Sequence, residues 1–261
     1  MNLPCAATRL TGALAALSSI GLAAGLVVGC TSGGSPQPAA ASGLAALSAK
    51  QILSKADAAA TAAGSLHFSS TTKDGPSSIT FSDDSASADG RQDITISDGG
   101  QMTVLVVRGI GYVDGNATAL SGFLGIPDAT AVQLAGRWIS FTSGAPGYQQ
   151  VVSGVTTSAV LTEINPVGAL SKTAPTMVDG QSVIGVRGPA PAGDGMPAGS
   201  DVTVYVAVKG RPLPVSCLEG SGKDETHITL SRWGEPVSVA VPPSAIPVPA
   251  PSAPPGPPII D

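Results

Sequence analysis

The chain has few side chains that could act as a nucleophile or a general base: two histidines, His67 and His227, and three cysteines. Each histidine alternates with apolar residues, on the side shared with Ser and Thr, so both are expected to be solvated. The sequence has no Gly-x-Ser-x-Gly motif, which would expose a nucleophilic serine on a strand-to-helix turn. Ser70 and Lys73 match Ser-x-x-Lys, but in a strand-like segment and without the partner motifs of penicillin-binding enzymes. We therefore expect that the protein is not an enzyme.

Motifs for cofactors and metals are equally sparse. Gly109 and Gly111 follow an apolar strand, but the third glycine and the following helix of a dinucleotide-binding turn are missing. The acidic pairs Asp83–Asp84 and Asp224–Glu225 are expected in turns, where carboxylates are solvated. No calcium-loop spacing surrounds either pair. The sequence therefore predicts neither a cofactor nor a metal.

Cys30 is the cysteine with the clearest chemical context. It follows an apolar, uncharged stretch from Leu10 to Gly29, which comes after the positive charge of Arg9. Such a stretch is typical of an export signal, although about 20 apolar residues could also form a transmembrane helix. The residues from Val27 to Cys30 resemble the lipobox of bacterial lipoproteins, with aliphatic residues and a glycine before the cysteine.

The lipobox resemblance implies that residues 1–29 are a signal peptide, cut before Cys30, whose sulfur receives a diacylglyceryl group with palmitate-like chains. Residues 30–43 would be a flexible tether to the extracytoplasmic face of the cell membrane, in the cell envelope. The alternative is a plain secretory signal with an incidental cysteine. Cys217 lies in a strand-like segment without a neighbouring base, so we expect it to be a buried and unreactive thiol.

Composition and charge narrow the partners. Charged residues are 12% of the chain and the net charge is −5, so the surface offers no cationic footprint for nucleic acid. It also lacks basic clusters for anionic lipid headgroups, so membrane attachment is expected to depend on Cys30. Residues 44–241 suffice for one domain with a core, expected to be monomeric. The proline-rich residues 242–261 are expected to form a disordered tail.

The domain is predicted to begin with a helix and to continue mainly as strands. Ser48 and Gln51 have the spacing of a capping box, and Gly64 is expected to end the helix. From Leu66 onwards apolar residues alternate with Ser and Thr, as in half-buried antiparallel strands. Helical spacing returns within residues 116–167. The predicted fold is α+β: nine or ten antiparallel strands in a curved sheet, with helices packed on one face.

The segment from Met102 to Val107 differs from the other strands because both of its faces are apolar. Such a strand must be covered on both sides, or one face must meet something apolar other than water. A sleeve of aliphatic side chains would offer acyl chains the same free-energy gain as a membrane, but an ordinary core has the same sequence pattern. The residues expected to line an acyl-chain cavity are Val104, Leu105, Val106, Leu120, Phe123, Leu124, Val151 and Val155.

The order of the elements and three local motifs resemble the mycobacterial LprG/LppX lipoprotein family. Residues 228–242, ITLSRWGEPVSVAVP, are similar to the closing hairpin of that family. Asp179-Gly180-Gln181 resembles its Asn-Gly-Gln turn, and residues 106–112 resemble one of its strand pairs. The resemblance covers residues 48–242, while residues 190–195 and the long proline-rich tail depart from it.

This resemblance implies a LolA/LprG-like fold, a curved antiparallel half-barrel closed by helices around an acyl-chain cavity. The function that it implies is binding, and transfer, of an acylated lipid or lipoglycan in the cell envelope. The alternative is a structural or protein-interaction lipoprotein with a solid core and no ligand cavity.

Overall fold

The computed structural model describes residues 43–74, 77–191, 200–220 and 226–249. The expected signal peptide, Cys30 with residues 31–42 of the tether, and residues 250–261 of the tail lie outside these ranges. So does the pair Asp224–Glu225. In the part of the chain that the structure describes, no helix has the length and apolar character needed to cross a membrane.

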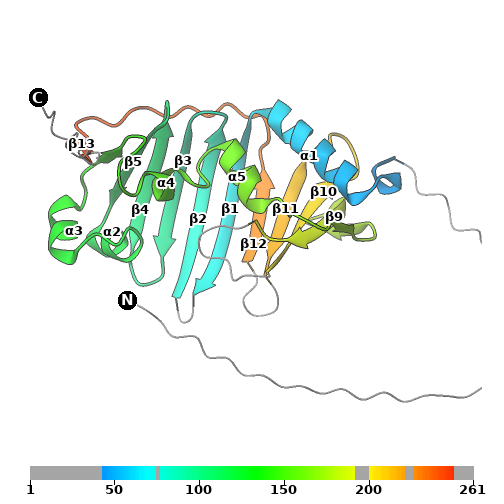
Figure 1. The fold of residues 1–261 in the computed structure, drawn as a ribbon, viewed down its shortest axis with the longest axis horizontal. Coiled ribbons are helices and arrows are strands. Elements are labelled where there is room, and N and C mark those ends of the chain that lie inside the picture. Colours follow the sequence, from blue (N-terminus) through cyan, green and yellow to red (C-terminus); the bar gives the residue numbers. More distant parts are fainter. Residues whose placement is uncertain (1–42, 75–76, 192–199, 221–225, 250–261) are drawn as a thin grey trace, which may run out of the picture. The chain divides into compact units, whose positions relative to one another are not determined.

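One open sheet forms the main layer of the domain (Figure 1). In chain order its strands are β1 (Ser65–Asp74), β2 (Ser77–Ala86), β3 (Gly90–Ile96), β4 (Gln101–Val107), β5 (Ile110–Gly115), β6 (Ile139–Phe141), β7 (Ser171–Lys172), β8 (Thr176–Val178), β9 (Gln181–Pro189), β10 (Asp201–Ala207), β11 (Pro214–Glu219), β12 (Thr226–Ser231) and β13 (Ile246–Pro247). Their order in the sheet is β13-β6-β5-β4-β3-β2-β1-β12-β11-β10-β9-β7, and β8 pairs with β9. Two antiparallel meanders, β1 to β6 and β9 to β12, are thus joined where β1 pairs with β12.

Helices cover one face of this sheet (Figure 1). The first helix begins and ends as predicted: the Ser48 and Gln51 side chains each accept a hydrogen bond from the other residue's backbone N–H, and Gly64 ends the helix at φ 78°. The left-handed φ at that position favours glycine, which has no Cβ. The predicted α+β class, with helices on one face of an antiparallel half-barrel sheet, is confirmed. The helices are η1 (Gly43–Ala46), α1 (Ala49–Ala63), α2 (Ala117–Gly122), α3 (Asp128–Leu134), α4 (Tyr148–Val152) and α5 (Thr157–Ile164).

The helix-covered face carries two apolar clusters rather than one. In the first cluster, α1 and α5 pack on β1 and on the meander of β9 to β12, around side chains such as Ile52 and Ile164. In the second cluster, α2, α3 and α4 pack on β3 to β6, around Leu120 and Val113. Burial of each such side chain stabilises the fold by roughly 1.5–3 kcal/mol. The two clusters share one sheet, so β1 and β2 lie where they meet.

The chain after β12 crosses the opposite face of the sheet, and we call residues 235–249 the C-terminal strap. Val239 and Ala245 of the strap pack against Leu105, Val107 and Tyr112. Further along, β13 pairs in parallel with β6, and the Ile246 and Val248 N–H groups donate to carbonyl oxygens of residues 138 and 140. The strap explains how the outer face of β4 is kept from water.

The strap corrects two expectations from the sequence. Residues 237–241 do not form the predicted return strand of a closing hairpin, because the chain leaves β12 and runs over the ends of other strands. Residues 242–249 were expected in a disordered tail, but they carry β13 and pack on the sheet. The folded domain therefore extends to at least residue 249.

A chain that ends at Val241 should be less stable than one that ends at residue 249. The shorter chain loses Ala245, Ile246 and Val248, which are half-buried against β4 to β6. We expect a loss of about 2 kcal/mol in the free energy of unfolding, measured by urea denaturation. The chain ending at 249 is the control and should match the full chain. Equal stability of the two truncated chains would contradict a stabilising role for the strap.

Candidate functional site

The side chains expected to line an acyl-chain cavity are divided between the two faces of the sheet. Val104 and Val106 face the helices and are buried in the second cluster, together with Leu120, Val151 and Val155. Leu105 points the other way and is buried beneath the strap. Both apolar faces of β4 are thus covered by the chain's own residues. Contact of these buried side chains with a ligand stays a prediction.

The remaining two of these residues, Phe123 and Leu124, lie in a different environment. They are half-buried at the margin of the second cluster, next to Ile79 and Phe81 of β2. The rings of Phe81 and Phe123 meet edge to face, with 6.5 Å between centroids. On β1, Phe68 is half-buried at the margin of the first cluster. We call these five residues the apolar strip.

The apolar strip lies at the edge of the region of the sheet that the helices cover. Figure 1 shows α5 crossing β1 and β2 towards the C-terminal end of β2, whereas Ile79 and Phe81 belong to its N-terminal half. Phe81 pairs in register with Ser70, and Phe68 pairs with Asp83. The strip therefore joins the two apolar clusters across β1 and β2, and its side chains keep part of their surface in water.

A polar group of side chains adjoins the strip on the same face of the sheet, and we call Asp83, Ser85 and Gln92 the polar seam. Asp83 is 1% exposed and Ser85 is 0% exposed. The Asp83 Oδ2 atom accepts a hydrogen bond from Gln92 Nε2 at 2.9 Å. Among the described residues, Asp83 Oδ1 and Ser85 Oγ have no hydrogen-bond partner. Such buried unpaired atoms are uncommon in folded proteins.

The position of Asp83 corrects the expectation that Asp83–Asp84 lies in a solvated turn. Both residues belong to β2, and alternation places Asp83 on the helix-covered face and Asp84 on the other. Asp83 is two residues from Phe81 and four from Ile79, so all three side chains point to the same face of the strand. This spacing was the sequence signal for the burial of Asp83.

Burial raises the pKa of Asp83 to about 8, against the opposing effect of the hydrogen bond from Gln92. The negative charges of Glu163, Asp93 and Asp84 raise the pKa further. The carboxyl group is therefore mostly protonated at neutral pH. Because Oδ2 accepts from Gln92, the proton belongs on Oδ1, which then becomes a hydrogen-bond donor without an acceptor.

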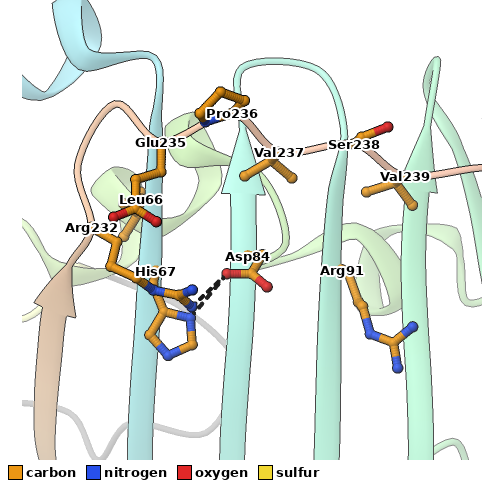
Figure 2. Close-up of a pocket in the computed structure, with 10 residues that line it drawn as sticks. All are labelled: Leu66, His67, Asp84, Arg91, Arg232, Glu235, Pro236, Val237, Ser238 and Val239. Atoms are coloured by element: carbon orange, nitrogen blue, oxygen red, sulfur yellow. Dashed lines mark hydrogen bonds and ion pairs between the residues drawn. The ribbon is translucent and has the colours of Figure 1, made fainter.

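The opposite face of the sheet has a hollow of about 260 Å³ beneath the strap (Figure 2). Asp84 Oδ1 lies 3.1 Å from His67 Nδ1 and 2.8 Å from Arg232 Nη2. Arg91 also lines the hollow, and it pairs with Asp93 at 2.8 Å. Each of the two arginines that line the hollow is thus paired with a carboxylate. His67, expected to be solvated, is half-buried and paired with Asp84.

The other candidate chemical groups lie apart from these features. His227 is exposed as predicted, and its Nε2 lies 2.8 Å from Oγ of the buried Ser216. Cys217 is buried on β11, as predicted, and burial raises the pKa of its thiol. Within residues 43–249, the described positions contain no group of three side chains arranged to hold a metal ion.

The similarity of this chain to known proteins lies in its structure. No protein-family model matches the sequence, and no curated protein matches it. The fold is similar to those of two mycobacterial lipoproteins. LppX from Mycobacterium tuberculosis is 18% identical at a TM-score of 0.47, covering 73% of this chain and 99% of LppX. LprF from Mycobacterium bovis is 16% identical at a TM-score of 0.45, covering 74% of this chain and 96% of LprF.

A third similar structure is an uncharacterized conserved protein from Thermus thermophilus, at 9% identity and a TM-score of 0.42. That match covers 77% of this chain and 98% of the Thermus protein. LppX and LprF are members of the lipoprotein group that the sequence resembles. At these identities and TM-scores, what those proteins bind does not transfer to this chain.

Proposed function

We propose that the protein is a cell-envelope lipoprotein that binds the acyl chains of a lipid or lipoglycan at the apolar strip. The observation that carries the proposal is the half-burial of Phe68, Ile79 and Phe81 between two closed clusters. Acyl chains laid on this strip would remove its remaining apolar surface from water. Each buried methylene group contributes about 0.8 kcal/mol, the same gain that a membrane offers. Transfer between the protein and a membrane then needs little net free energy.

The proposed anchor is the diacylglyceryl group on Cys30, with the domain on the extracytoplasmic side of the membrane. Two acyl chains give a stable attachment where one does not. The net charge of the full chain is −5, so it provides no electrostatic attraction to anionic headgroups, and the anchor would keep the domain near the membrane. The protein would act as a monomer with a lipid as its ligand.

The proposal predicts that Phe81→Gln weakens acyl-chain binding, while Thr80→Gln does not. Phe81 lies in the strip, whereas Thr80 is exposed on the opposite face of the same strand. With the mature chain, residues 30–261, binding of the fluorescent fatty acid cis-parinaric acid should fall about tenfold or more in Phe81→Gln. The lost apolar contact and the desolvated amide both disfavour the complex.

Thermal melts of both variants check that they remain folded. A wild-type chain that binds no parinaric acid, or two variants that bind it equally well, would contradict the proposal. The structural or interaction lipoprotein without a ligand site would then be the better reading.

A further inference from the structure

We infer that the polar seam recognises a neutral oxygen of the ligand, the ester carbonyl of an acylglycerol-type lipid whose chains lie on the apolar strip. The inference rests on the proposed function and adds a polar contact to it. Its basis is the pair of unpartnered atoms, Asp83 Oδ1 and Ser85 Oγ, which lie two residues apart on one face of β2.

The polar seam contains hydrogen-bonding groups that no described residue pairs with. A protonated carboxyl group donates one hydrogen bond, and a hydroxyl group both donates and accepts. Asp83 Oδ2 is engaged by Gln92, but the described residues give Oδ1 and Ser85 Oγ nothing to bind. Buried polar atoms of this kind normally meet protein, ordered water or a ligand. A ligand oxygen beside Asp83 would accept the hydrogen bond that Oδ1 can donate.

The seam is continuous with the apolar strip. Ile79, Phe81, Asp83 and Ser85 follow one another on the same face of β2, with about 7 Å between successive members. Exposure decreases along this row, from half-buried Ile79 and Phe81 to fully buried Ser85. A lipid lying on the strip would therefore bring its polar linkage to the buried end of the row, where Asp83 stands.

The chemistry of the seam favours a neutral acceptor over a charged group. Burial holds Asp83 protonated at neutral pH, because its pKa is raised to about 8. Among the described residues, the charged groups that raise the pKa of Asp83 are Glu163 on α5, Asp93 on β3 and the adjacent Asp84, and all three are acidic. They disfavour a phosphate or carboxylate at the seam. Two apolar clusters flank the site, so a cation would lose its hydration there. An ester carbonyl carries no charge and accepts the hydrogen bond that Oδ1 offers.

The test compares 1,2-dioleoylglycerol with its dialkyl ether analogue, which differs by lacking the two ester carbonyl groups. Each lipid displaces cis-parinaric acid from the mature chain at pH 6.5. Wild type should prefer the ester by about tenfold, the value of one well-formed hydrogen bond. Asp83→Leu should bind both lipids with the affinity that wild type shows for the ether. Asp83→Asn should keep the preference, because its amide can accept from Gln92 and still donate.

Two further measurements keep the result decisive if Asp83→Leu does not fold. Raising the pH to 9.5 ionises Asp83 and removes its donor, so the wild-type preference should disappear, while that of Asp83→Asn should persist. Asp84→Asn, on the opposite face, should behave like wild type at both pH values.

The outcomes separate the inference from the proposed function. Equal affinity of wild type for ester and ether would overturn the inference and assign the seam to internal water, with lipid binding intact. A preference that persists in Asp83→Leu, or in wild type at pH 9.5, would also overturn it. If neither lipid displaces the probe, the result would instead count against the proposed function.

Discussion

Replacing Gly90 with alanine should lower the free energy of unfolding by about 3 kcal/mol or more. Gly90 begins β3 beneath the link between α4 and α5, and a Cβ atom at this position would overlap the Val155 carbonyl oxygen. The obstacle is backbone, not the end of a flexible side chain, so a strand or the link must shift. Overpacking of a buried site typically costs 1–3 kcal/mol, occasionally more, and a backbone obstacle belongs at the upper end.

The measurement is urea unfolding of Gly90→Ala beside Gly122→Ala. Gly122 ends α2, and a Cβ atom there would have no atom within 4 Å. The control should be as stable as wild type or up to about 1 kcal/mol more stable, because alanine favours the helix. The Gly90 variant should melt roughly 6–12 °C lower than wild type, as expected for a domain of this size. Equal melting temperatures would show that the α4–α5 link does not pack on β3.

The Gly90 contact matters for the candidate site as well as for stability. Gly90 pairs in register with Ser85, so the link that packs on Gly90 lies close to the Ser85 end of the polar seam. Val155 of the link is fully buried in the second cluster. A loosened link should therefore expose Asp83 and Ser85 to water. Partial loss of the ester preference in Gly90→Ala is the expected accompanying result.

Replacing Cys30 with serine should block lipidation and leave an uncut or a soluble protein. The proposed anchor forms by acylation of the Cys30 thiol, and a serine hydroxyl group does not substitute for it in the lipobox. Wild type should partition into the detergent phase of a Triton X-114 separation, and the mature-sized form of the variant should partition into the aqueous phase. Cys5→Ser and Cys217→Ser are matched controls. The first lies in the expected signal peptide, and the second is buried on β11, so neither change should alter the partitioning.

Metabolic labelling with a fatty acid gives an independent readout of the anchor. Label should enter wild type and both control variants, and it should be absent from Cys30→Ser. A labelled Cys30→Ser protein, or equal partitioning of its processed form and wild type, would contradict acylation at this cysteine. A plain secretory signal would then explain the apolar segment before residue 30.

Local sequence determined the elements whose physical causes are local. The capping box of Ser48 and Gln51 and the glycine at position 64 set both ends of α1, because these contacts join residues within one turn of helix. Alternation of apolar and polar residues identified β1 to β3, since successive side chains of a strand point to opposite faces. The two apolar faces of β4 predicted that each side of this strand is covered by protein or by something else apolar, and the structure covers both with the chain's own residues.

Tertiary structure decided what covers each face and which polar groups are buried. The outer face of β4 is covered by Val239 and Ala245, from a strap that the sequence placed in a strand and a disordered tail. Residues 242–249 belong to the fold because β6, far away in the chain, supplies the hydrogen bonds for β13. Asp83 resembled a turn residue beside Asp84 until its pairing with Phe68 and Gln92 placed it between two clusters. Burial and pairing across a sheet depend on residues distant in sequence, and no local pattern records which distant segment supplies them.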